Sequence, residues 1–257
     1  METIINCSNI NFSYNGSRVL NGINLSVQTG RMLGILGANG AGKSTLLKIL
    51  CGLLKPSSGE SFYKNNSISK ISKREVAKGI AYIPQDAMFA FPFTVKEVVL
   101  MGRAPYIGRF EFERELDQEI ADKALLSVGI SHLKTRLISE VSAGEKQLAS
   151  IARGLVQEPE VLILDEPATY LDIKHRTEIM TILKKLKDED GISIIAATHD
   201  IFSSLFYFDE IIVLKEGKIL AEGKSEEIVD GELLSRAYGI EVTVRKENGR
   251  VFIFPNQ

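Results

Sequence analysis

The segment GANGAGKST, residues 37–45, constrains the fold of this chain more than any other feature. It follows the apolar run RMLGILG and precedes KSTLLKILCGLL, whose leucines and isoleucines recur at helical spacing, so we expect a strand, a glycine-rich loop and a helix that KPSSGE ends. In that context G-x-x-x-x-G-K-[S/T] indicates a phosphate-binding loop, because glycines let backbone amides turn toward phosphate oxygens. The alternative is a glycine-rich turn with a surface lysine, which these flanks make much less favoured. The predicted phosphate-binding residues are Gly37, Ala38, Asn39, Gly40, Ala41, Gly42, Lys43, Ser44 and Thr45.

Two acidic residues complete the predicted phosphate chemistry. Lys43 should bring positive charge to the β- and γ-phosphates of a nucleotide, and the Ser44 hydroxyl should ligate Mg²⁺. The run VLILDE, residues 161–166, is a buried strand that ends in Asp165 and Glu166, at the carboxyl end where ligands of such sheets bind. We expect Asp165 to hold Mg²⁺, through water, and Glu166 to orient and deprotonate the attacking water. Alone, the two could equally be solvated carboxylates, but their pairing with a phosphate loop favours the functional interpretation.

The order of the predicted elements indicates an α/β fold. The first part of the chain contains β-rich runs, and residues 86–157 form a mostly helical insertion that begins with the aromatic stretch DAMFAFPFTV. The chain then returns to buried strands, VLILDEP, ISIIAATHD and EIIVLKEGKILAEG, with HRTEIMTILKKLKDED as an intervening helix. Strand, helix and strand in succession predict a parallel sheet. The tail IEVTVRKENGRVFIF alternates apolar and polar residues around ENG, which predicts a hairpin.

A second helix start raises a question that composition cannot answer. In EVSAGEKQLASIARGL, residues 140–155, a Ser-Ala-Gly turn precedes a helical run, as in helices whose first amides face an anion. The chain already has a phosphate loop. This second start therefore holds either another ligand or the same ligand from another direction.

The order of these motifs resembles the ATP-binding cassette family over nearly the whole chain. The family's Leu-Ser-Gly-Gly-Gln/Glu motif stands here as Val141-Ser142-Ala143-Gly144-Glu145. The resemblance implies a P-loop NTPase core with a parallel sheet, an N-terminal antiparallel β subdomain and an inserted helical subdomain, all within residues 1–238, followed by a hairpin extension at residues 239–257. It also implies ATP as substrate and a head-to-tail pair of chains, in which this motif binds the γ-phosphate of the ATP held by the other copy. Ala143 replaces the first glycine of the motif, and its methyl group could obstruct the turn.

Other positions are assigned by the same resemblance. Tyr14 corresponds to the aromatic residue that stacks on adenine, although a Tyr sharing one strand face with Phe12 is the alternative. Gln85 corresponds to the glutamine that contacts Mg²⁺ and the attacking water, and the alternative is a solvated loop amide. His199 corresponds to the switch histidine at the γ-phosphate, whereas a lone histidine is more often structural. Asp172, in PATYLD, would lie at the interface of the pair or serve as a helix N-cap, and the two roles are compatible.

Composition excludes several other classes of protein. The formal net charge of −2 gives no general attraction to nucleic acid. Cys7 and Cys51 are isolated, which disfavours a disulfide framework, a zinc site or an iron–sulfur cluster. The N-terminus lacks the layout of a signal peptide, and no apolar run approaches the roughly 20 residues needed to cross a bilayer. If this chain acts at a membrane, a partner protein must therefore anchor it there.

Within the family, a single cassette without membrane segments favours a stand-alone import subunit. The stretches VVLMGRAPYIGRF and YLDIKH resemble cassette subunits of iron–siderophore, haem and cobalamin permeases. This implies a second copy of the chain, transmembrane permease subunits and, indirectly, an extracytoplasmic substrate-binding protein as partners, with the chain peripheral on the cytoplasmic face of the cell membrane. An importer of a free metal, an oxyanion or another nutrient, or a soluble non-transport ATPase, are the alternatives. Five residues could form either helix core or a groove that docks the permease: Phe89, Phe91, Phe93, Met101 and Tyr106.

Overall fold

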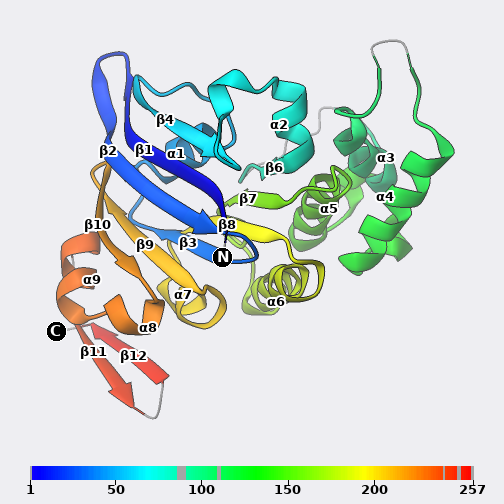
Figure 1. Ribbon diagram of the computed structural model, residues 1–257. Helices are drawn as coiled ribbons and strands as arrows, with labels where there is room; N and C mark the ends of the chain where they lie inside the picture. Colours follow the sequence, from blue (N-terminus) through cyan, green and yellow to red (C-terminus); the bar gives the residue numbers. More distant parts are fainter. Residues whose placement is uncertain (1, 86–90, 109–110, 240, 248–249, 256–257) are drawn as a thin grey trace.

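The computed structural model describes residues 2–85, 91–108, 111–239, 241–247 and 250–255 (Figure 1). A six-stranded sheet forms its centre, with the strand order β10-β9-β3-β8-β7-β6. Neighbouring strands are parallel except β10, which pairs antiparallel with β9 at one edge. The strands of this sheet are β3 (Met32–Leu36), β6 (Ile80–Ile83), β7 (Val161–Asp165), β8 (Ser193–Thr198), β9 (Glu210–Lys215) and β10 (Lys218–Gly223). The predicted parallel sheet is confirmed.

Both faces of the central sheet are buried along β3, β7 and β8, which explains why these strands are almost uniformly apolar. Successive residues point to opposite faces: Leu162 and Leu164 belong to one hydrophobic core, and Val161 and Ile163 belong to the other. Ile163 and Leu164 are both fully buried. These strands therefore have no solvated face, and polar groups that could bind a ligand emerge at their ends.

An antiparallel sheet covers α1 on one side of the molecule. Its strand order is β2-β1-β4-β5, and its strands are β1 (Thr3–Tyr14), β2 (Ser17–Gln28), β4 (Ser58–Tyr63) and β5 (Asn66–Ser67). Leu46 and Leu50 of α1 pack in one core with Ile5 and Ile23 of this sheet. The third β-rich run, β3, belongs instead to the central sheet, because it pairs with β8 and β9.

Helix α1 (Lys43–Leu50) is shorter than its leucine pattern predicts. Cys51 caps it, and Gly52 follows with φ +72°, a left-handed conformation that ends a helix readily. Leu53 lies beyond the helix and is 56% exposed. The expectation that KPSSGE ends the helix was wrong, because the glycine that precedes it already does so.

The segment that follows contains elements that the sequence did not predict. Among them is α2 (Lys73–Gly79), whose N-cap Ser72 accepts a hydrogen bond from the Glu75 amide. Two turns of 3₁₀ helix lie at Ile68–Lys70 and, further along the chain, at Ser131–Leu133, which contains His132.

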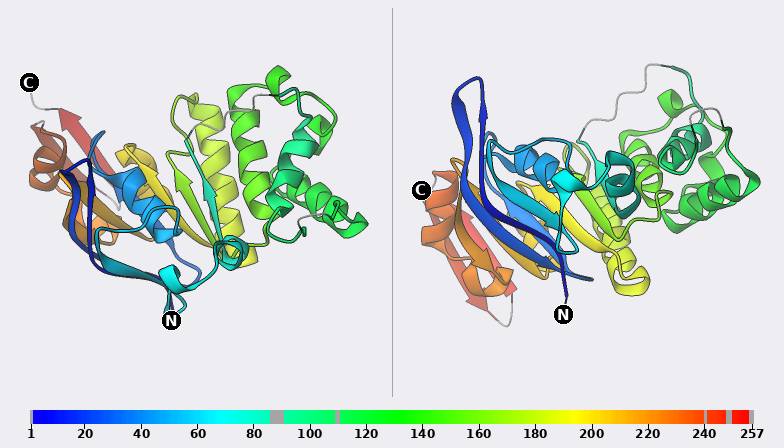
Figure 2. Two further views of the ribbon diagram at one scale, coloured as in Figure 1. Left: turned by 90° about the horizontal axis from the view of Figure 1, so that it is seen from above. Right: turned by 45° about the horizontal axis from the view of Figure 1, so that its top comes forward.

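The helices predicted for residues 86–157 gather beside one edge of the central sheet (Figures 1 and 2). They are α3 (Val95–Leu100), α4 (Glu115–Ser127) and α5 (Ala143–Leu155), with 3₁₀ turns at Met101–Arg103 and Ile138–Glu140. The expected start of the insertion, at residue 86, lies outside the described residues. The division of the chain into subdomains stays a prediction.

A buried ion pair holds these helices together. The Arg103 Nε atom donates to the Asp117 carboxylate of α4 at 2.8 Å, with the two side chains 2% and 0% exposed. Arg103 also donates to the Val156 carbonyl at 2.7 Å and to Glu158 at 2.8 Å. The Tyr106 ring stacks on its guanidinium at 3.9 Å. One arginine therefore joins the segment after α3 to α4 and to the end of α5.

The segment after β10 lies at the end of the molecule opposite to α3, α4 and α5 (Figure 2). The remaining helices are α6 (Ile173–Asp190), α7 (Ile201–Tyr207), α8 (Ser225–Ile228) and α9 (Gly231–Tyr238). The predicted hairpin forms from β11 (Val242–Glu247) and β12 (Arg250–Pro255), while the NG of its turn lies outside the described residues. In the described part of the chain, no helix is long and apolar enough to span a membrane.

Candidate nucleotide-binding site

The loop between β3 and α1 has a backbone that requires glycine. Gly37 has φ +156° and Gly42 has φ +103°, both unfavourable for residues with a side chain. A Cβ atom on Gly37 would lie 2.3 Å from the Leu214 carbonyl oxygen, and one on Gly42 would lie 2.8 Å from Leu20. The glycines of the motif therefore fix a tight turn packed against β9 and β2.

The first turn of α1 is open to an anion. Gly42 provides no side-chain cap, and the turn contains no acidic residue. Lys43 is buried, 5% exposed, and its ammonium donates to the Gly37 carbonyl at 2.8 Å. Free amides and a buried cation at one helix start fit the phosphates of a nucleotide.

Asp165, at the end of β7, faces this loop. It accepts hydrogen bonds from the Ser44 hydroxyl at 2.9 Å and from the Tyr82 hydroxyl at 3.1 Å. Burial and, next, the Asp165 charge raise the pKa of Tyr82, so Tyr82 remains a donor. A carboxylate beside a hydroxyl from the phosphate loop is a donor set that suits Mg²⁺. Tyr82 was missed in the sequence, where it reads only as part of an apolar strand.

Glu166 lies at the centre of a network of polar contacts. It adopts a left-handed conformation, φ +50°, directly after β7. Its carboxylate lies 3.3 Å from the Lys43 ammonium, accepts from the Thr169 hydroxyl at 2.8 Å and contacts His199 Nδ1 at 3.0 Å. Burial acts to raise the pKa of Glu166, but Thr169, Lys43 and His199 more than offset it and hold the pKa below its usual range. Glu166 is therefore ionised.

Gln85 lies close to the same network. It lines a pocket together with Glu166, Thr169 and Ala143, the first residue of α5. The structure thus brings three separate sequence motifs to one cavity. Tyr14 lies apart: it is 47% exposed and packs edge-on against Phe12, with ring centroids 4.7 Å apart.

The start of α5 is capped by its own side chains. Ser142 accepts from the Glu145 amide at 3.3 Å, and the Glu145 carboxylate accepts from the Ser142 amide at 2.7 Å. Ala143 is exposed and helical, so its methyl group strains no turn. Ala143 needs no unusual φ, because the residue begins a regular helix, and an effect of its methyl group on a second copy stays a prediction.

Gly144 and Asp172 bring α5 and α6 together. A Cβ on Gly144 would lie 2.6 Å from the ring of His175, so glycine lets the two helices approach. Asp172 caps α6 by accepting from the His175 amide at 2.9 Å, and its other oxygen lies 2.9 Å from His175 Nδ1. The predicted N-cap is confirmed. His175 therefore packs between Gly144 and Asp172, which belong to two different motifs.

Together, the glycine loop, the buried lysine and the paired carboxylates define the class of P-loop nucleotide-binding proteins. The comparisons with known proteins place the chain more closely: it belongs to the ABC transporter family, whose model matches residues 20–169. The family's ATP-binding subunits bind ATP and are ATPases that power transport, and this chain is an ATPase of that kind.

Curated relatives are similar along nearly their whole length. The uncharacterized ABC transporter ATP-binding protein MJ0089 of Methanocaldococcus jannaschii is 37% identical, covering 98% of this chain and 98% of its own length. The petrobactin import ATP-binding protein FpuC of Bacillus anthracis is 35% identical over 99% of this chain and 93% of its own. The ferric enterobactin transport ATP-binding protein FepC of Escherichia coli is 36% identical over 90% and 85%.

Solved structures share the fold. A putative metal-chelate type ABC transporter in an inward-facing conformation superposes with a TM-score of 0.87, covering 100% of this chain and 98% of its own, at 24% identity. The ATP-binding cassette MJ0796, in a dimeric post-hydrolysis state bound to ADP and Pi, has a TM-score of 0.76 at 28% identity, covering 86% and 99%. The predicted family and fold class are confirmed.

Proposed function

We propose that this chain is the ATP-hydrolysing subunit of an importer that takes up a metal chelate, of the iron–siderophore, haem or cobalamin type, through a separate permease. The names of FpuC and FepC support the cargo class, and the contact of Glu166 with both Lys43 and His199 supports the chemistry. The permease would hold the chain at the cytoplasmic face of the membrane.

In this proposal the described contacts define the roles of the residues. Lys43 and the amides of residues 37–45 bind the phosphates, and Tyr14 stacks on adenine. Glu166 takes the proton of the attacking water, and His199, 3.0 Å away, fixes the carboxylate and contacts the γ-phosphate. Ser44, Gln85 and Asp165 would hold Mg²⁺, which would neutralise phosphate charge.

We further propose that two copies of the chain share their ATP. Ser142, Ala143, Gly144 and Glu145 would meet the γ-phosphate held by the partner, and Asp172 would lie at the interface. The dimeric MJ0796 cassette supports this arrangement. Tyr170 and Ile173, on either side of Asp172, are 88% and 81% exposed, as expected of residues that a second copy would cover.

The permease is proposed to dock on the helices between residues 86 and 157. Phe91 is 67% exposed and Met101 is 39% exposed, so both are available for docking. Phe93 is partly buried against the core, and the Tyr106 hydroxyl donates to the Gln157 carbonyl at 2.7 Å. Tyr106 therefore has a structural role, and Phe89 lies outside the described residues.

The test is transport by the complex itself. The tagged chain, purified with its permease and reconstituted in lipid vesicles, should hydrolyse ATP faster when a binding protein loaded with a ferric siderophore, haem or cobalamin is added. Stimulation by free metal, oxyanion or another nutrient would support the alternative importer. ATP hydrolysis with no association with a membrane protein would support a soluble ATPase.

A matched pair of variants tests the docking surface. Phe91→Asp should lower uptake per ATP hydrolysed about 10-fold while leaving ATP affinity unchanged, because the exposed ring would pack against the permease and belongs to the segment before α3, not to the phosphate loop. Leu53→Asp, a comparably exposed leucine outside residues 86–157, serves as the control and should leave the coupling unchanged. Full coupling in Phe91→Asp would remove this residue from the docking surface.

A further inference from the structure

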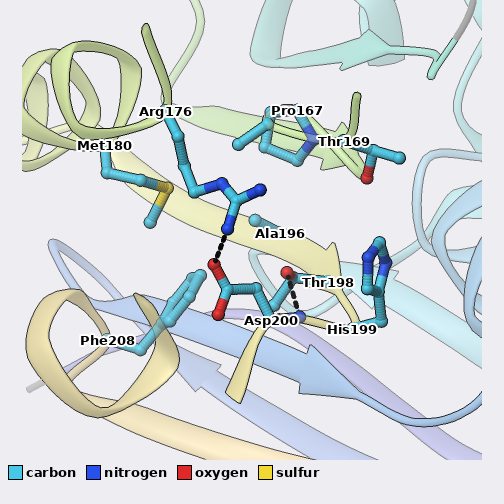
Figure 3. Close-up of a pocket in the computed structure, with 10 residues that line it drawn as sticks. Pro167, Thr169, Arg176, Met180, Ala196, Thr198, His199, Asp200 and Phe208 are labelled. Atoms are coloured by element: carbon cyan, nitrogen blue, oxygen red, sulfur yellow. Dashed lines mark hydrogen bonds and ion pairs between the residues drawn. The ribbon is translucent and has the colours of Figure 1, made fainter. Parts of the chain in front are cut away.

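Arg176, in the first turns of α6, contacts two loops that leave adjacent strands of the central sheet. Its NH1 group donates to the Asp200 carboxylate at 3.0 Å, and its NH2 group is 3.4 Å from the Leu171 carbonyl oxygen. Leu171 belongs to the loop that follows Glu166, and Asp200 directly follows His199. Figure 3 shows Arg176 reaching from α6 to Asp200, with His199 on the adjacent side of the pocket.

The loop that bears His199 also has a hydrogen bond of its own. The Asp200 amide donates to the Thr198 hydroxyl at 3.0 Å, which shapes the turn but does not join it to another element (Figure 3). The His199 side chain is 49% exposed, and Glu166 is the partner that the structure records for its ring. The position of a half-exposed ring with this one recorded contact depends on how its backbone is held.

The geometry points to Arg176 as a positioning residue that, through Asp200, holds His199 at the γ-phosphate side of Glu166. This inference rests on the role proposed above for His199. A planar guanidinium can contact both loops at once, which a lysine ammonium cannot do with the same geometry. The contact to Leu171, the residue before Asp172, also means that a second copy pressing on Asp172 would act on His199 through Arg176.

The test is a set of double-mutant cycles on ATP hydrolysis by the full chain. Arg176→Gln should lower kcat about 10-fold with ATP affinity within about 2-fold of wild type, and Asp200→Asn should do the same. The double variant should be no slower than either single variant. In a His199→Ala background, Arg176→Gln should have no further effect, because the residue it positions is gone. Lys184→Gln, on an exposed turn of α6, is the matched control.

The outcomes separate this inference from the proposed function. If His199→Ala hydrolyses ATP at the wild-type rate, the role of His199 fails. If His199→Ala is slow but Arg176→Gln is not, or if their effects multiply, the positioning role of Arg176 is overturned. Arg176→Lys should remain as slow as Arg176→Gln, and recovery of the wild-type rate would contradict the need for a forked donor. Loss of folding in both Arg176→Gln and Asp200→Asn would assign the pair to the fold alone and overturn the inference.

Discussion

Two helices in this chain begin at motif residues, α1 after Gly42 and α5 after Ser142, and they satisfy their first amides in opposite ways. The start of α1 has Gly42 as its N-cap, no side-chain acceptor and a buried Lys43. The start of α5 has Ser142 and Glu145 in a reciprocal capping box. Both are N-termini with the same helix dipole, but one leaves its amides to a ligand and the other uses its own side chains.

The difference shows that a turn followed by a helix does not define an anion site. At α5, the Ser142 amide is the main cause of the lowered pKa of Glu145, so a carboxylate already stands at this helix start. A phosphate that binds there would do so beside that charge. The contribution of α5 to ATP binding should therefore be smaller than that of α1, and should appear only when a second copy brings the phosphate to it.

Comparing the two helix N-termini first requires a variant that binds ATP without hydrolysing it. Glu166→Gln should retain ATP binding and lower kcat about 1000-fold, because the amide keeps the shape of the carboxylate but accepts no proton. Phosphate release and equilibrium binding of ATP measure the two effects separately. Full turnover in this variant would place the general base elsewhere.

Removing the Lys43 ammonium tests the uncapped N-terminus of α1 directly. Lys43→Ala should weaken ATP binding about 100-fold, since the phosphates lose a buried charged donor. The variant also leaves the Glu166 carboxylate, 10% exposed, without its nearby ammonium, so the pKa of Glu166 should rise.

Lys48→Ala, in the last turn of the same helix, is the matched control for Lys43→Ala and should bind ATP normally. Nucleotide titration of both variants makes the comparison. Unchanged ATP affinity in Lys43→Ala would exclude the phosphate loop from nucleotide binding.

A bulky residue at the capped N-terminus of α5 should affect dimer formation and not ATP binding by one chain. In a Glu166→Gln background, size-exclusion chromatography should show a dimer that forms with ATP and not with ADP. Ser142→Arg should raise the dissociation constant of this dimer at least about 10-fold, with little change in the affinity of the monomer for ATP. Ser142→Ala removes the cap without the bulk, at a cost of about 1 kcal/mol in stability, and controls for helix fraying. A dimer that ignores ATP or Ser142→Arg would make this stretch an ordinary capped helix.

The smallest expected effect on the dimer concerns Ala143, which stands where the family motif has a glycine. Because Ala143 is exposed and helical, Ala143→Gly should change the dimer dissociation constant less than about 3-fold. The same chromatography measures it. A much tighter dimer would show that the methyl group obstructs the partner's phosphate, although it obstructs nothing within one chain.

The sequence predicted those parts of the fold whose signals are local. VLILD and its neighbours read as buried strands because both faces of the central sheet are covered, which leaves no polar residue in β7 before Asp165. The length of α1 was wrong because helical spacing continues through Leu53 and Leu54, whereas Gly52 ends the helix. β4 (Ser58–Tyr63) was missed because it is polar and gains its structure by pairing with β1.

In the candidate site, too, only the residues with a local sequence signal could be predicted. Motifs with fixed spacing located Lys43, Asp165 and Glu166, which the structure brings within contact of one another or of shared partners. The Tyr82 hydroxyl and the Arg176 guanidinium come from elements that meet the site only in three dimensions, and no local pattern marks them. The roles of Tyr14, Gln85 and the residues 142–145 in nucleotide binding remain predictions.

The buried Arg103 has a mechanical consequence for the helices between residues 86 and 157. Its contacts with Asp117, with the Val156 carbonyl and with the Tyr106 ring leave little room for these segments to slide past one another. Gly102, whose Cβ would lie 2.0 Å from the Arg153 carbonyl oxygen, brings the backbones into direct contact at the same point. We therefore expect α3, α4 and α5 to move as one rigid unit, so that any displacement of α3 also displaces Ser142 at the start of α5.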